Sequence, residues 1–166
     1  MRTFTALATL TGVATAVGVA GCRTDATAWR KALAAPAVQH LAGSWDIVLR
    51  RYDGSDTLRW RRVAGHVALT LNDQALDIDG IGARPMVFGA FDVDFDSLGV
   101  HPGTSAGIPA VAGFIAGDSL RLVFGPATAL PLELRGMLRG DSASGEWHAF
   151  QRAGPGAIGD FTLHRR

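Results

Sequence analysis

Short stretches of alternating apolar and polar residues dominate the chain after residue 40. Successive side chains of a strand point to opposite faces, so this period of two predicts strands with one apolar face. Clusters of Gly, Asp, Asn, Ser and Pro separate the stretches and are typical of turns. No segment in this region has a sustained helical period. We therefore expect strands at residues 45–52, 58–71, 86–95, 110–116, 120–124, 130–138, 146–150 and 158–165.

The phase of each alternation assigns its faces. Leu132 and Leu134 share one side of their strand, and Glu133 and Arg135 share the other. One apolar face per strand implies a single shared interior, and the mostly short connections favour an antiparallel meander. Eight strands that close on themselves leave no exposed edge. The sequence therefore predicts an all-β fold, an eight-stranded antiparallel up-and-down barrel, whose interior is either packed or able to hold one small ligand.

The N-terminal segment has a different character. Residues 3–21 contain no charge, are rich in Ala, Thr, Val and Gly, and end in Val19-Ala20-Gly21-Cys22. This pattern resembles a bacterial lipoprotein signal, in which the cysteine is lipidated and becomes the first residue of the mature protein. The resemblance implies a signal peptide at 1–21, an anchor at Cys22 that makes the membrane a partner, and an exported protein of the cell envelope. In a Gram-negative source it favours the outer membrane. The alternative for Cys22 is a lone buried or reactive thiol.

Removal of residues 1–21 would leave about 145 residues, enough for one domain with its own core. We expect residues 22–40 to form a tether with one or two helical turns at 28–35, interrupted by Pro36. The barrel domain then covers residues 41–166.

Gly43-Ser44-Trp45 opens the first predicted strand and resembles the Gly-x-Trp signature of lipocalins and the wider calycin group. That resemblance implies a tryptophan at the closed end of the barrel, with a basic residue from the last strand packed across it. Arg165 is the candidate, with Arg166 as a fallback. In a closed meander with an even number of strands, the first strand starts at the rim where the last strand ends. The chain departs from true lipocalins because it lacks a helix before the last strand and the central Thr-Asp-Tyr-type motif.

The lipocalin resemblance implies a non-enzymatic function, the binding of a small apolar or amphipathic molecule in the barrel mouth. Trp60 and Trp147 would line the ligand site if they point inward, and the Gly- and Pro-rich loop 101–109 would lie at the mouth. The alternative is an envelope protein with a fully packed barrel, which works through its surface as a structural or interaction protein. An integral outer-membrane barrel is disfavoured, because the strand faces alternate apolar with charged residues and lack aromatic girdles.

One motif raises the question of catalysis. Gly117-Asp118-Ser119-Leu120 spells the GDSL block of a class of esterases, which also need an Asp-x-x-His block near the C-terminus. Asp160 and His164 have three residues between them instead of two, and the chain offers no helices for an α/β scaffold. The sequence therefore argues against a GDSL-type esterase, and we expect no catalytic residues.

The remaining charged residues give no clear site. Asp92, Asp94 and Asp96 alternate with apolar residues and would line one strand face about 7 Å apart, either as a solvent-facing edge opposite Arg59, Arg61 and Arg62 or as a calcium ligand set. The five histidines lack the spacing of metal ligands, so we expect no metal and no cofactor. A net charge of +1 gives no electrostatic case for nucleic acid.

Overall fold

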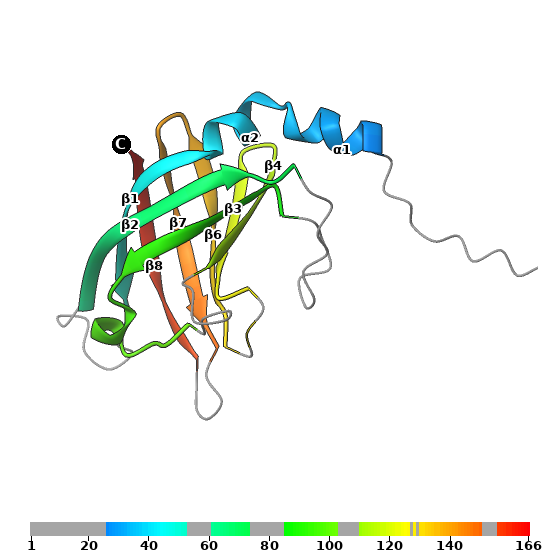
Figure 1. Cartoon of the computed structure of the whole chain (residues 1–166). Helices are drawn as coiled ribbons and strands as arrows, with labels where there is room; N and C mark the ends of the chain where they lie inside the picture. Colours follow the sequence, from blue (N-terminus) through cyan, green and yellow to red (C-terminus); the bar gives the residue numbers. More distant parts are fainter. Residues whose placement is uncertain are drawn as a thin grey trace, which may run out of the picture.

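The computed structural model describes residues 26–52, 61–73, 85–102, 110–126, 128, 130–150 and 156–166. Its strands follow one another around a closed antiparallel barrel, and β8 pairs with β1 to complete it (Figure 1). The eight-stranded up-and-down barrel predicted from the alternation is confirmed. The strands are β1 (Gly43–Arg51), β2 (Arg61–Leu71), β3 (Val87–Val93), β4 (Val111–Ala116), β5 (Ser119–Phe124), β6 (Leu132–Arg139), β7 (Ser142–Ala149) and β8 (Ala157–Arg165).

Several strand boundaries differ from those predicted, and two of the differences have a clear physical reason. β7 begins at Ser142, four residues before the expected start, because Gly140 adopts φ +56° and makes the turn tight. β3 ends at Val93, and Phe95–Leu98 form the single-turn helix η1. Phe95 and Leu98 are buried there, so apolar burial ends the strand that the acidic alternation had extended.

The inward side chains of all eight strands form one hydrophobic core. The alternation holds in β8, where Phe161 and Leu163 are buried and His164 is exposed. Burial of large apolar side chains is the main favourable contribution to folding. The largest fully buried side chains are Trp45, Trp147, Phe124, Phe161, Leu41, Ile47, Leu49, Leu98, Leu122, Leu132, Leu134 and Leu163.

Two short helices, α1 (Ala26–Leu33) and α2 (Pro36–Leu41), lie across one end of the barrel, next to the C-terminus (Figure 1). Pro36 begins α2 in the first turn, where a missing backbone N–H costs nothing. Val38 and Leu41 are buried in the core, so the segment expected as a tether includes a helix packed on the barrel. Within the described residues, no helix is long and apolar enough to span a membrane.

η1 lies at the end of the barrel opposite the two helices, in green in Figure 1. Arg51, at the end of β1, donates a hydrogen bond of 2.7 Å from its Nη1 to the carbonyl oxygen of Leu98. A cation at the last carbonyls of a helical turn is a favourable cap. η1 therefore covers part of this end, with Phe95 and Leu98 facing the core.

Candidate ligand-binding barrel and its surface grooves

Trp45 and Arg165 meet at the end of the barrel below α2. They are direct cross-strand partners between β1 and β8, and the guanidinium carbon of Arg165 lies 5.7 Å from the centroid of the Trp45 ring. Trp45 is 1% exposed, and its indole N–H donates a 2.9 Å hydrogen bond to the carbonyl oxygen of Leu41. The tryptophan thus joins the first strand to the helix that covers this end.

Arg165 also binds the helix. Its guanidinium donates a hydrogen bond to the carbonyl oxygen of His40, the penultimate residue of α2. The His40 ring meets Trp45 edge-on at 6.3 Å, and its Nε2 lies 3.1 Å from a carboxylate oxygen of Asp141 in the β6–β7 turn. These contacts tie α2, β1, β8 and the turn together, so this end of the barrel is closed.

Trp147 lies inside the barrel towards the other end. It is fully buried, and its indole N–H donates a 2.9 Å hydrogen bond to the carbonyl oxygen of Arg50. The indole passes over Gly159, where an added Cβ would lie 2.5 Å from the indole nitrogen and 1.8 Å from the Arg50 oxygen. The absence of a side chain at Gly159 therefore lets the tryptophan cross β8 and bind β1. In this position Trp147 belongs to the core.

The pairing of β3 with β4 is the shortest in the barrel. Only Val87, Phe88 and Gly89 of β3 have partners on β4, whereas β3 is paired with β2 along its whole length. The other neighbouring strands share six to nine residue pairs, as in β4–β5 and β1–β2. The second half of β3, from Ala90 to Val93, therefore has no paired neighbour on its β4 side among the described residues. We call this part of the β3–β4 boundary the seam.

Three phenylalanines pack together behind the seam. The ring of Phe91 lies 5.3 Å from that of Phe95 and 5.0 Å from that of Phe124, and the last two are 5.5 Å apart. All three contacts are edge-to-face, the arrangement that aromatic rings prefer. Phe124 is fully buried, whereas Phe91 faces inward and stays half-buried. The trio is therefore an apolar surface inside the barrel that begins at its weakest lateral pairing.

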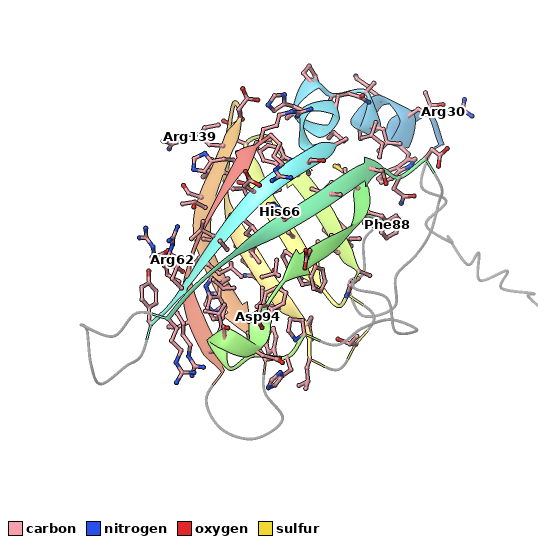
Figure 2. The ribbon with its side chains drawn as sticks, turned by 60° about the vertical axis from the view of Figure 1, so that its left-hand side comes forward. Arg30, Arg62, His66, Phe88, Asp94 and Arg139 are labelled. Atoms are coloured by element: carbon pink, nitrogen blue, oxygen red, sulfur yellow. The ribbon has the colours of Figure 1, made fainter. Side chains whose placement is uncertain are left out.

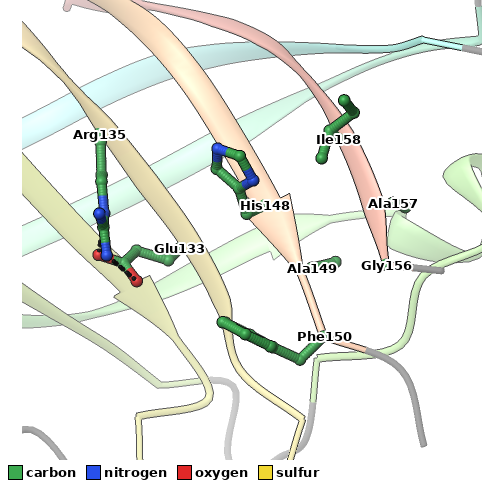
Figure 3. A pocket seen from close by; sticks show the side chains of 8 residues that line it. All are labelled: Glu133, Arg135, His148, Ala149, Phe150, Gly156, Ala157 and Ile158. Carbon is green, nitrogen blue, oxygen red and sulfur yellow. Dashed lines mark hydrogen bonds and ion pairs between the residues drawn. The ribbon is translucent and has the colours of Figure 1, made fainter.

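A groove of about 390 Å³ lies on the outside of β6, β7 and β8, towards the end that carries η1 (Figure 3). Glu133 and Arg135 form one wall, Ile158 forms the opposite wall with His148 between them, and Phe150 lies at the lower end. Ala149, Gly156 and Ala157 complete the lining. The groove combines a fixed charge with exposed apolar side chains.

Glu133 is the buried charge of this groove, with a side chain only 8% exposed. Its Oε1 accepts hydrogen bonds from Arg121 Nε at 2.5 Å and Arg135 Nε at 2.6 Å, and its Oε2 accepts one from Arg135 Nη2 at 3.1 Å. Burial opposes ionisation of the carboxyl, but the bonds from Arg135 and Arg121 outweigh it, so the pKa of Glu133 is lowered. Arg121 also lies 5.7 Å from the ring of Phe114. The cluster is a fixed ion-pair network.

A second groove, of about 360 Å³, lies over β2 and β3 near the closed end. Asp46 accepts a 2.7 Å contact from His66 Nδ1 and another from Arg166 Nε. All three side chains are about half exposed, so solvent screens their interactions. No cluster of three or more potential metal ligands occurs in the described part of the chain.

The residues of the esterase-like motif lie apart. Ser119 begins β5 after the β4–β5 turn, and its hydroxyl contacts the sulfur of Met137 at 3.8 Å. His164 and Asp160 are on β8, and β6 and β7 separate that strand from β5. Gly117 has φ +59°, as a tight hairpin turn requires. The structure does not bring the serine, histidine and aspartate together.

The acidic residues 92, 94 and 96 do not line one strand face. Asp92 is paired with His66 on β2, Asp94 accepts a 2.6 Å hydrogen bond from Ser97, and Asp96 contacts His101 at 2.7 Å. The bond from Ser97 is the main reason why the pKa of Asp94 is lowered. All three side chains are exposed, as expected, but the expectation of one continuous strand face was wrong, because the chain turns into η1 after Asp94.

Several predicted features lie outside the described residues. They are the signal segment 1–21, Cys22, Trp60, Arg59 and most of the loop 101–109, of which 103–109 are not described.

The comparisons with known proteins are sparse. No protein-family model matches the chain, and no curated protein matches it. Among solved structures, the crystal structure of Rv2717c from M. tuberculosis is similar, with a TM-score of 0.38 and 18% sequence identity. The match covers 80% of this chain and 98% of that one. A similarity at this level assigns no function.

Sequence reasoning missed two of these features. It placed Glu133 and Arg135 on the outward face, but Arg121 joins them only through the β5–β6 register, which pairs it with Arg135. It treated Phe91 and Phe95 as the apolar half of an acidic strand. Residues four apart share a face in a strand as well as in a helix, so the spacing of the two phenylalanines carried no signal of the turn into η1.

Proposed function

We propose that this protein is an exported, lipid-anchored protein of the cell envelope whose barrel binds a small apolar or amphipathic molecule without catalysis. The interior behind the seam is the binding region, and Phe91, Phe95 and Phe124 are its apolar wall. The end formed by Trp45, Arg165 and α2 is structural. No metal or cofactor is part of this function.

The observation that carries the proposal is the half-buried ring of Phe91 at the seam. Every other phenylalanine or tryptophan on the inward face of a described strand is buried. Apolar binding sites in proteins are concave, mostly apolar and contain few polar groups. The edge-to-face rings supply an apolar surface, and the short β3–β4 pairing supplies a region that can separate at low cost.

A fluorescent apolar probe tests the binding. 1-Anilinonaphthalene-8-sulfonate should bind the folded protein saturably, and dodecanoate should displace it. Phe91→Leu should change the affinity for the probe by about fivefold or more, since one aromatic ring carries much of the contact area. Phe88→Leu is the matched control, because Phe88 is the outward neighbour on the same strand (Figure 2) and should leave the affinity unchanged. Equal effects of the two variants would contradict an interior site.

The anchor is tested separately. Cells that express the protein should incorporate an alkyne-labelled fatty acid into it, and Cys22→Ser should abolish the label. A single acyl chain gives only marginal attachment, so the label should correspond to more than one chain. Equal labelling of the original chain and of the Cys22→Ser variant would refute lipidation at Cys22 and leave the ligand proposal untouched.

The dense core favours one second candidate, a packed barrel that works only through its surface. Trp147 fills the interior next to β1 and β8, and Leu98 and Phe95 fill it under η1. This candidate predicts that neither the probe nor dodecanoate binds the folded protein.

A further inference from the structure

Most of the exposed large apolar side chains of the described residues lie at one end of the barrel. There are four of them: Tyr52, Met137, Phe150 and Ile158, with exposed fractions of 39%, 40%, 57% and 46%. Three lie at the end that carries η1, because Tyr52 follows β1, Phe150 follows β7 and Ile158 is the second residue of β8. The backbone N–H of Tyr52 donates to the carbonyl oxygen of Ile158, so these two are direct neighbours. Phe150 and Ile158 line the same groove (Figure 3).

A row of charged residues runs around the outside of the barrel. It lies two residues further along the strands from this end than Tyr52 and Ile158 do. Cross-strand pairing sets its order from β5 to β2 as Arg121, Arg135, Glu146, Asp160, Arg50 and Arg62. The row has four arginines and two acids. Arg50 and Arg62 are directly opposite each other, and like charges in this position are destabilising unless an anion neutralises them. Within the described part of the chain, the ion pair of Arg50 is a 4.0 Å contact to Asp160.

The acids of this region already have partners in the protein. Asp160 faces Arg50 and also lies 3.5 Å from the Tyr52 hydroxyl, and Glu146 lies 3.9 Å from His148. Glu133 is held by two arginines. Asp94 and Asp96 lie at the same end, at η1 beside β2, and they are bound to Ser97 and His101 (Figure 2 labels Asp94). Among the described residues, Arg121 and Arg135 are neutralised by Glu133, whereas Arg50 has only a long contact with an acid and Arg62 has no ion pair. Arg50 and Arg62 are therefore the arginines of the row that are open to an external anion.

The apolar side chains and the row of charged residues follow one another in a fixed order along the barrel axis. Arg50 and Tyr52 are two residues apart, as are Asp160 and Ile158, so the apolar tips extend about 7 Å beyond the charged row. The surface of an anionic bilayer has the complementary order, with phosphates outside and acyl chains inside. Arginine and aromatic side chains are the residues that bind such an interface.

We propose that this rim, formed by Tyr52, Phe150, Ile158, Arg50 and Arg62, docks on the surface of an anionic phospholipid bilayer. The three apolar side chains enter the headgroup region, and the two arginines bind lipid phosphates. The rim lies at the end of the barrel opposite α1 and α2 (Figure 1). Its contact with the bilayer is therefore separate from any anchor at Cys22, and it needs no occupied interior.

A position-specific probe tests the contact in the full chain with Cys22→Ser, so that every variant shares the same N-terminal segment. The single-cysteine variants Ile158→Cys and Met137→Cys are labelled with nitrobenzoxadiazole and mixed with vesicles. Met137 is the matched control, because its exposure is similar and it lies nearer the closed end. With vesicles containing about one-third phosphatidylglycerol, the label at 158 should shift to the blue and the label at 137 should not.

Charge variants give a second readout. Arg50→Gln with Arg62→Gln should lower the partition coefficient onto phosphatidylglycerol vesicles about 30-fold, the effect of two surface arginines. Arg30→Gln with Arg139→Gln changes charge equally at the other end (Figure 2) and should have little effect. Added salt should weaken the binding of the unsubstituted rim. Near-ultraviolet circular dichroism of the tryptophans checks that each variant is folded.

Three results would overturn the proposal. The first is an equal response of the labels at 158 and 137, which would mean attachment through the N-terminal segment alone. The second is an equal loss of binding in the two double-glutamine variants. The third is a label at residue 158 that does not respond to vesicles but is shielded from solvent by a protein partner. That result would assign the surface to a protein.

Discussion

Arg165 lies over the indole ring of Trp45, 5.7 Å from its centroid, while its guanidinium binds the carbonyl oxygen of His40. The first strand, the last strand and α2 therefore meet at one pair of side chains. A cation over an indole contributes about 0.5–2 kcal/mol, with the larger values where water is excluded. This pair closes both the sheet and one end of the barrel.

Truncation of Trp45 should strongly destabilise the protein. Trp45→Ala removes a side chain that is 1% exposed and a hydrogen bond to Leu41. The expected loss in the free energy of unfolding is about 3–5 kcal/mol, as for other buried tryptophans. Urea denaturation measures it. A loss below about 1 kcal/mol would mean that the residue does not hold the closed end together.

Arg165→Met keeps much of the apolar stem but removes the charge and the bond to His40. We expect a loss of about 1–3 kcal/mol in unfolding free energy, because a partly buried carbonyl loses its donor. Arg139→Met is the control, since Arg139 is an exposed residue at the same end. Its expected effect is within about 0.5 kcal/mol. Similar losses in both variants would show that Arg165 acts only as a surface charge.

Gly159 should not tolerate a side chain. An added Cβ would lie 1.8 Å from the Arg50 carbonyl oxygen and 2.5 Å from the Trp147 indole nitrogen. Gly159→Ala should therefore break the Trp147–Arg50 hydrogen bond, destabilise the protein by about 1–3 kcal/mol and shift the tryptophan emission to the red. At Gly117 a Cβ would meet nothing within 4 Å. Gly117→Asn should cost little, because asparagine accepts positive φ, and an equal cost would refute the steric account.

Stability should depend on pH through Glu133. The pKa of this carboxyl is lowered from its ordinary value of 4.5 in the folded protein. A group with a lowered folded pKa stabilises the protein above the unfolded pKa, and this stabilisation is lost as pH falls through the folded pKa. Glu133→Gln should thus be less stable than the original chain at pH 7, and the difference should shrink as pH falls below about 4.5.

Urea midpoints at pH 7 and pH 3 measure this difference. Asp118→Asn is a control, because Asp118 is an exposed acid in the β4–β5 turn. A difference between the Glu133→Gln variant and the original chain that stays constant from pH 7 to pH 3 would contradict the ion-pair account.

The period-two pattern predicts most of the barrel because each strand buries one face. Leu132 and Leu134 are an example, because they alternate with Glu133 and Arg135. Only one orientation of this strand places the leucines in the shared interior and the charged side chains in solvent. The pattern does not predict the start of β7, because Ser142, Ala143 and Ser144 have weak strand propensity. Their strand state comes from the neighbouring β6 and β8.

The candidate site is less predictable, because it depends on register and on packing between strands. Phe91, Phe95 and Phe124 come together only when β3 stops pairing with β4 and η1 turns inward. The rim likewise depends on which residues end each strand. Neither arrangement follows from the sequence of one segment.

The central claim is that the interior behind the seam binds a small apolar molecule, and nuclear magnetic resonance tests it most directly. Dodecanoate is titrated into the ¹⁵N- and ¹³C-labelled protein, and chemical-shift changes are followed for each residue. The account predicts saturable changes that are largest at the rings of Phe91, Phe95 and Phe124 and at the amide of Ala90, with little change at Trp45. Changes confined to outer residues such as Phe150 and Ile158, or no saturable changes at all, would contradict it.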